Sequence, residues 1–273
     1  MFNFKSLLNR ASPRAETTTP FDFGRILNWK ILRGSHEFPG PDGGTCINEA
    51  AIVAAGYPYT PVRRIDDCPA SFSRPLALYA MCLNEIVLSD ALRQELLMPF
   101  VTRLASSADT LETDLERVAL ILRRTVSEIL PEAFEFAGRG REARRCRGVA
   151  TIQEAVAVVK ELSGQDWHGR GVHLTGLINS ISMASEDYLA FRAVDAAQYA
   201  GTAIADVAEV IGSVGGRGAA AATEKVYRQG AVILDAALKI GNRADAIAID
   251  LVATRMETAK RAASSEQRTV TVE

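Results

Sequence analysis

Cys46 stands in a position typical of a nucleophilic cysteine, directly after a glycine-rich segment and at the start of a predicted helix. The N-terminus of a helix carries a partial positive charge, which lowers the pKa of a thiol and favours the reactive thiolate. His36 lies upstream in the sequence and is the candidate base. The sequence contains no recognisable His–Asp or His–Asn partner motif, so a buried structural cysteine is the competing interpretation.

A run of arginines is the second group of residues with a possible chemistry. It lies in the glycine-bounded stretch 138–148 and consists of Arg139, Arg141, Arg144, Arg145 and Arg147. At helical spacing Arg141, Arg144 and Arg145 share one face, and together with Arg147 they are candidates for binding phosphate or an acidic partner. Because glutamates lie nearby, a solvated helix face is the alternative. No aromatic residue is interleaved, so a base-stacking platform for nucleic acid is not supported.

The histidines and cysteines do not have the spacing of a metal site. Structural zinc is normally held by closely paired ligands. The candidates considered are His36, Cys46, Cys68, Cys82, His168 and His173. The cysteines form no CxxC pair, and two glycines separate His168 from His173, so these two do not stack on a helix face. The glycine-rich segment 212–218 follows a predicted helix and lacks the Lys-Ser/Thr of a phosphate loop. We therefore expect no metal and no cofactor.

Composition limits the class of protein further. The 273 residues are 48% apolar, which is enough to fill a core, and 31 basic against 33 acidic side chains leave a formal charge of -2. This balance argues against a dedicated nucleic-acid binder. No apolar run has the length of a membrane span, and the first residues lack the apolar core of a secretory signal. We expect reduced thiols, a cytoplasmic location and no membrane partner.

The elements that would position Cys46 and the arginines are predicted to be helices. Thr45 is the predicted cap of a helix that runs to about Ala55 and ends at Gly56. Further caps are predicted at Ser73, Ser89, Asp109 or Thr110, and Thr151, the last in a capping box with Glu154. We expect Pro99 to kink its helix, and Pro131 to end or kink the next one.

The second half of the chain is rich in alanine and has helical apolar stripes, with small residues that allow close helix packing. The fold class expected is all-α, an N-terminal helical module with long loops followed by an Ala-rich antiparallel bundle or hairpin. The predicted division is a flexible segment 1–20, a helical module 21–130, a basic connecting segment 131–150, an Ala-rich region 151–263 and a frayed tail 264–273.

Two motifs carry a resemblance to other proteins. The sequences HEFPGPDGGTCINEAA at 36–51 and LRQELLMPFVTRL at 92–104 resemble an uncharacterised family of bacterial hypothetical proteins. The resemblance covers about residues 34–104 specifically and implies a module boundary, but no activity and no catalytic residues.

Three functions follow as hypotheses from these features. The leading one is a noncatalytic helical module that binds another protein or a second copy of itself, because no complete catalytic constellation is visible. The second is a thiol-dependent hydrolase or transferase that uses Cys46 and His36. The third is anion or nucleic-acid binding through Arg139–Arg147.

Overall fold

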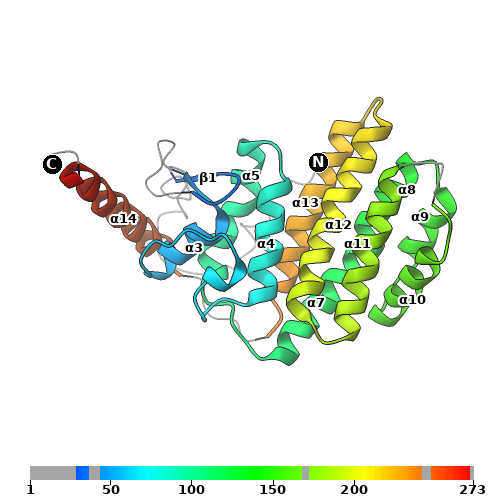
Figure 1. Cartoon of the computed structure of the whole chain (residues 1–273), viewed down its shortest axis with the longest axis horizontal. Coiled ribbons are helices and arrows are strands. Elements are labelled where there is room, and N and C mark those ends of the chain that lie inside the picture. The colour runs from blue at the N-terminus through cyan, green and yellow to red at the C-terminus, as the bar shows by residue number, and fades with distance from the viewer. Residues whose placement is uncertain (1–28, 37–43, 168–171, 242–246, 271–273) are drawn as a thin grey trace, which may run out of the picture.

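The protein is essentially all-α, as the sequence predicted. A computed structural model describes residues 29–36, 44–167, 172–241 and 247–270 (Figure 1). Within these ranges the only strands are β1 (Lys30–Ile31) and β2 (Gly44–Thr45), which pair in parallel. The predicted flexible segment 1–20, His168, most of the glycine- and proline-rich loop and residues 271–273 lie outside the described residues.

The helices of the N-terminal part begin close to the predicted caps. They are α3 (Ile47–Ala55), the 3-10 turn η1 (Ile65–Asp67), α4 (Arg74–Ile86), α5 (Asp90–Leu97), the 3-10 turn η2 (Met98–Phe100) and α6 (Val101–Leu104). Ser73 and Ser89 cap α4 and α5 through their hydroxyl groups, as predicted. Pro99 lies within η2, so the predicted kink takes the form of a 3-10 turn between two α-helices.

The cap of α3 differs from the prediction. Cys46, not Thr45, is the N-cap, since its Sγ accepts from the backbone amide of Glu49 and the Glu49 carboxylate accepts from the amide of Cys46. The hydroxyl of Thr45 accepts instead from Trp29 Nε1 at 2.7 Å, and Thr45 pairs with β1. The helix ends at Gly56, whose φ of 88° is the predicted left-handed conformation.

A continuous helical segment follows, made of α7 (Leu111–Arg124), the π-helical turn η3 (Thr125–Ile129) and α8 (Leu130–Phe136). Thr110 caps α7. Apart from Pro131, the buried residues of the segment recur as adjacent pairs four positions apart: Arg117 and Val118, Ile121 and Leu122, Thr125 and Val126, Ile129 and Leu130, Ala133 and Phe134. A regular α-helix has about 3.6 residues per turn. The wide π turn, closed by Leu130 N–H donating to Thr125 O, helps to keep these pairs on one side. Pro131 therefore lies inside a helix that continues, and does not end it.

The next helices are the arginine-rich α9 and the helices of the Ala-rich stretch after it. They are α9 (Gly140–Arg147), α10 (Ile152–Ser163), α11 (Val172–Leu189), α12 (Ala193–Val214) and α13 (Ala219–Ala237). Thr151 and Glu154 form the predicted capping box at the start of α10. Helix α12 is central and packs against α11, α4, α13, α7 and α8 (Figure 1). The close approach of α12 to α4 depends on Gly201, where an added Cβ would lie 2.6 Å from the Cβ of Cys82.

Helix α14 (Ile249–Val270) projects from the body beside α3 (Figure 1). Val252 and Met256 are buried, and Arg255 Nη1 donates to Ala54 O at the end of α3 over 2.6 Å. The helix extends to Val270, well into the stretch predicted to be frayed. Contacts between α14 and α3, and between α12 and α4, join segments on both sides of the predicted divisions at 130 and 150.

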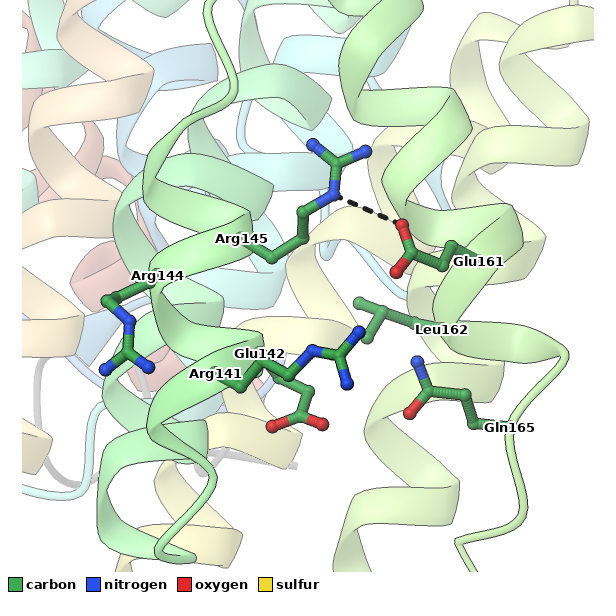
Figure 2. Close-up of a pocket in the computed structure, with 7 residues that line it drawn as sticks. All are labelled: Arg141, Glu142, Arg144, Arg145, Glu161, Leu162 and Gln165. Atoms are coloured by element: carbon green, nitrogen blue, oxygen red, sulfur yellow. Dashed lines mark hydrogen bonds and ion pairs between the residues drawn. The ribbon is translucent and has the colours of Figure 1, made fainter.

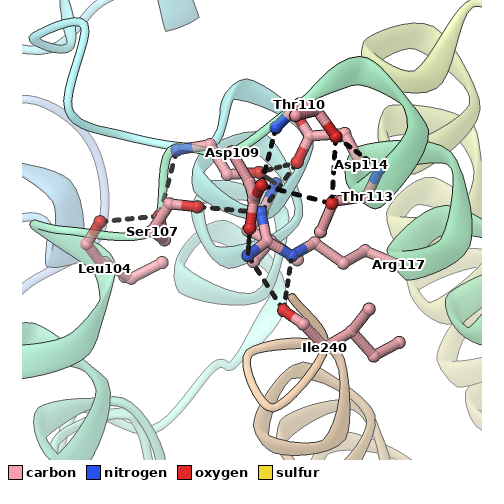
Figure 3. A network of polar contacts seen from close by, with 10 residues as sticks. Leu104, Ser107, Asp109, Thr110, Thr113, Asp114, Arg117 and Ile240 are labelled. Atoms are coloured by element: carbon pink, nitrogen blue, oxygen red, sulfur yellow. Dashed lines mark hydrogen bonds and ion pairs between the residues drawn. The ribbon is translucent and has the colours of Figure 1, made fainter. Parts of the chain in front are cut away.

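A buried polar network also joins these segments (Figure 3). At its centre is Arg117 of α7, whose side chain is 1% exposed. Its Nη1 donates to Ser107 O at 2.8 Å and to Asp114 Oδ1 at 2.9 Å, and its Nη2 donates to Ile240 O at 3.0 Å. Asp109 adds a second carboxylate, with Oδ2 3.7 Å from Nη2. One guanidinium thus binds the α6–α7 loop and the end of α13.

Candidate functional site

The arginine-rich stretch forms one wall of a pocket between α9 and α10 (Figure 2). Its volume is about 370 Å³. The described residues that line it are Arg141, Glu142, Arg144, Arg145, Glu161, Leu162 and Gln165. Their polar groups are guanidinium, carboxylate and carboxamide groups, so the pocket offers both cationic donors and anionic acceptors to a ligand.

The predicted arginines differ in how they are placed. Figure 2 shows Arg141 and Arg145 directed from α9 towards α10, whereas Arg144 leaves a different side of the helix. Arg145 Nε lies 3.1 Å from Glu161 Oε2. Among the described residues, Arg141 has no hydrogen-bond or ion-pair partner, so its charge is available to a ligand. The structure thus brings together two of the four candidates, with Arg144 at the margin.

Arg147, the fourth candidate, does not line the pocket. Its Nη1 pairs with Glu135 Oε1 at 2.5 Å, and Nη2 lies 3.8 Å from Glu132. The hydrogen bond between the two raises the pKa of Arg147 and lowers the pKa of Glu135. Two carboxylates of α8 therefore already balance the positive charge of Arg147. Its contacts give no support to the predicted role in anion binding.

A tryptophan binds the backbone of one lining residue, Leu162. Trp167 Nε1 donates to Leu162 O at 2.8 Å, and its ring lies 5.7 Å from that of Phe134. The guanidinium carbon of Arg139 lies 5.5 Å from the centre of the Trp167 ring, within the range of a cation–π contact. Arg139 thus helps to fix the end of α10 against the core and does not face the pocket.

Three lining residues were missed at the sequence level. Glu161, Leu162 and Gln165 come from the end of α10 and the turn after it, about one helix away from the arginines in the chain. Their position opposite α9 is a result of tertiary packing. No spacing or composition signal in the sequence pairs a single glutamate with an arginine of another helix.

Cys46 lies in a different part of the molecule, at the buried start of α3. Its side chain is 2% exposed. The predicted lowering of its pKa is wrong: burial raises the pKa well above the usual value, and the neighbouring Glu49 carboxylate raises it further. Those contributions outweigh the hydrogen bonds from the backbone amides of Glu49 and Asn48, which lower the pKa. Cys46 is therefore a neutral thiol whose sulfur caps the N-terminus of α3.

His36 does not act on this thiol in the structure. Its Nε2 donates to Arg33 O at 2.9 Å, and its backbone amide donates to Glu49 Oε1 at 3.3 Å. No hydrogen bond joins the imidazole to Cys46 among the residues described. The predicted pair of Cys46 and His36 therefore gains no support as a nucleophile and its base.

Glu49 is the functional group that sequence reasoning missed in this region. It is fully buried, and its carboxylate accepts from the amides of Cys46 and Val62 at 2.8 and 2.9 Å. It also accepts from the hydroxyl of Ser35 at 2.7 Å. Together with His36, these donors satisfy the carboxylate, so its role is to hold two loops against α3. The capping-box spacing of Cys46 and Glu49 was the signal in the sequence.

The other thiols resemble Cys46 in having raised pKa values. Burial raises the pKa of Cys68 to about 11, and those of Cys82 and Cys146 to about 12. Over the described residues, histidine, cysteine and carboxylate side chains form no group of three that could hold a metal ion.

Comparison with known proteins finds no relative of this chain. No family model, curated protein or solved structure matches it. The resemblance noted for 36–51 and 92–104 therefore stays a prediction. In the part of the chain that the structure describes, not one helix combines the length and apolarity needed to cross a membrane.

Proposed function

We propose that this protein is a noncatalytic helical binding protein that takes up an anionic group in the pocket between α9 and α10. The observation that carries the proposal is the convergence of Arg141 and Arg145 on one pocket, with Arg141 unpaired among the described side chains. An anionic group of an acidic partner or of a small phosphorylated molecule has the chemistry that this pair of arginines recognises.

The pocket offers more than charge. The side-chain amide of Gln165 can donate a further hydrogen bond, and Leu162 supplies an apolar floor for the rest of the ligand. A volume of about 370 Å³ lies within the range of small-ligand sites, which is roughly 300–1,000 Å³. These features favour an anionic group attached to a small organic body over a bare ion.

The test is a titration of the isotopically labelled protein with phenyl phosphate, followed by nuclear magnetic resonance. We expect shifts that map to the pocket, including the side-chain amide of Gln165. Arg141→Gln and Arg145→Gln should each weaken binding by about tenfold or more, because each removes a charge-assisted hydrogen bond. Arg147→Gln is the matched control, since it removes the same charge from the same helix outside the pocket.

Binding should also weaken steeply as salt is added, because the contact is electrostatic and partly exposed. The proposal is contradicted if phenyl phosphate causes no shifts, if Arg147→Gln weakens binding as much as Arg141→Gln, or if the affinity does not respond to salt.

Self-association of the chain stays a prediction from its sequence. The feature that supports it is the turn between α11 and α12, where Leu189 is 58% and Phe191 is 70% exposed. Light scattering over a wide range of protein concentration measures the solution mass. A strict monomer throughout would rule out self-association.

A further inference from the structure

Glu161 occupies a particular place in the pocket. Its carboxylate binds Arg145 across the gap between α10 and α9, with Oε2 3.1 Å from Nε (Figure 2). The other glutamate of the pocket, Glu142, has no hydrogen-bond or ion-pair partner among the described residues. Of the two arginines directed towards α10, Arg145 is thus paired internally and Arg141 is not; Arg144 also lines the pocket but leaves a different side of α9.

We propose that Glu161 is an internal competitor whose carboxylate occupies the ligand's place on Arg145, so that the pocket admits a dianionic phosphoryl group in preference to a monoanion. This inference rests on the proposed function of the same pocket. It adds the class of anion and the group that the anion must displace.

Exchange of Glu161 for a ligand is feasible because the internal pair is weak. The side chains of Arg145 and Glu161 are 50% and 46% exposed, so water and salt screen their attraction. An ion pair of this kind contributes little to stability. Breaking it therefore leaves the fold intact, and a ligand that offers Arg145 a stronger partner can take its place.

The class of ligand follows from the number of new contacts that a ligand gains when it displaces Glu161 from Arg145. A monocarboxylate that displaces Glu161 replaces one carboxylate on Arg145 with another, and its new contact is with Arg141 alone. A phosphate monoester has three terminal oxygens and up to two negative charges, so it can bind both guanidinium groups at once. Binding with displacement of Glu161 therefore yields more free energy for the dianion than for the monoanion.

The first experiment compares three probes at pH 8: phenyl phosphate, phenyl sulfate and benzoate. Phenyl sulfate has the shape of the phosphate ester and one negative charge, so it separates charge from geometry. We expect phenyl phosphate to bind at least about tenfold more tightly than either monoanion, because its second negative charge lets it pair with both guanidinium groups, a gain of about the size of one charge-assisted contact.

The second experiment compares Glu161→Gln with Glu142→Gln, which removes the same charge from the same pocket without breaking a pair. A general electrostatic effect would raise the affinity for phenyl phosphate equally in both variants. Loss of the Glu161 carboxylate should raise the affinity for phenyl phosphate by a further two- to fivefold in Glu161→Gln, which is the factor that corresponds to the free energy of an exposed ion pair. In an Arg145→Gln background this additional gain should disappear, because Glu161 then has no arginine to compete for.

The outcomes separate this inference from the function on which it rests. Equal effects of Glu161→Gln and Glu142→Gln, weaker binding by Glu161→Gln, or equal affinity for phenyl phosphate and phenyl sulfate would each overturn it while pocket binding stands. Absence of binding by all three probes would overturn both. A specific gain in Glu161→Gln that depends on Arg145, together with preference for the dianion, supports it.

Discussion

Replacement of Arg117 by methionine removes the centre of the buried network in Figure 3 and retains most of the apolar stem. Two carbonyl groups, Ser107 O and Ile240 O, lose their donor. Asp114 and Asp109 lose their cation, while Asp114 keeps the hydroxyl of Ser73 at 2.7 Å. Each orphaned buried acceptor costs about 1–3 kcal/mol, and loss of one partner of a buried ion pair costs about 3–5 kcal/mol.

These contributions overlap, because one guanidinium serves all of the acceptors. We therefore expect Arg117→Met to lower the free energy of unfolding by about 4 kcal/mol, a large part of the roughly 5–15 kcal/mol of a typical protein. The melting temperature should fall by about 8–16 °C, since each kcal/mol corresponds to about 2–4 °C in a chain of this size. Urea unfolding followed by circular dichroism measures the free energy, and calorimetry the temperature.

Arg123→Met is the control, because it removes an arginine from the same helix where no hydrogen bond or ion pair is formed with the described residues. It should change stability by less than about 0.5 kcal/mol. The double variant Arg117→Met/Asp114→Asn should recover part of the loss, since one of the two carboxylates that have lost their cation becomes a neutral amide. A cost below about 1 kcal/mol for Arg117→Met, or no recovery in the double variant, would refute this account of the network.

Two further predictions concern a thiol and a carboxylate. Iodoacetamide should alkylate Cys46 more slowly than it alkylates N-acetylcysteine at pH 7–9, because burial and Glu49 raise the pKa of the Cys46 thiol. Mass spectrometry of the native protein measures the rate. A faster reaction of Cys46 would support the hypothesis of a nucleophilic thiol. Burial by itself raises the pKa of Asp235, but hydrogen bonds from Lys239 and Arg103 outweigh this and lower it. Asp235 should therefore contribute stability above its unfolded pKa of about 4 and lose it as the pH falls through the lower folded value. Urea unfolding between pH 2 and 7 should show a flatter acid limb for Asp235→Asn, and an unchanged limb would contradict the prediction.

Local chemistry is the part of the fold that could be predicted. Ser73, Ser89, Thr110 and Thr151 each cap a helix through a contact within three residues, so the information lies next to the site of action. The same reasoning was wrong at Thr45. There a distant partner, the indole N–H of Trp29, binds the hydroxyl, and the neighbouring cysteine serves as cap. Composition and local pattern contain no trace of that contact.

The candidate site also depends on tertiary contacts that the sequence does not reveal. The arginines of α9 were recognised because they are adjacent in the chain, but which of them face a pocket depends on α10 and α8. Glu135 and Glu132 neutralise Arg147, while Arg141 is left for a ligand. The pKa of Cys46 was misjudged for a related reason. The helix N-terminus was visible in the sequence, whereas the burial that outweighs it was not.

The π turn at Thr125–Ile129 has a consequence for how this chain can vary in length. A π turn holds one residue more than the α-helical turn it replaces. Loss of one residue there would convert the turn to regular α-helix and leave α7 and α8 in their present orientation, with Arg117 and Phe134 still facing the core. Loss of one residue elsewhere in the segment would rotate every later side chain by about 100°. The turn is therefore the place in this helical segment where deletion of a single residue should disturb the core least.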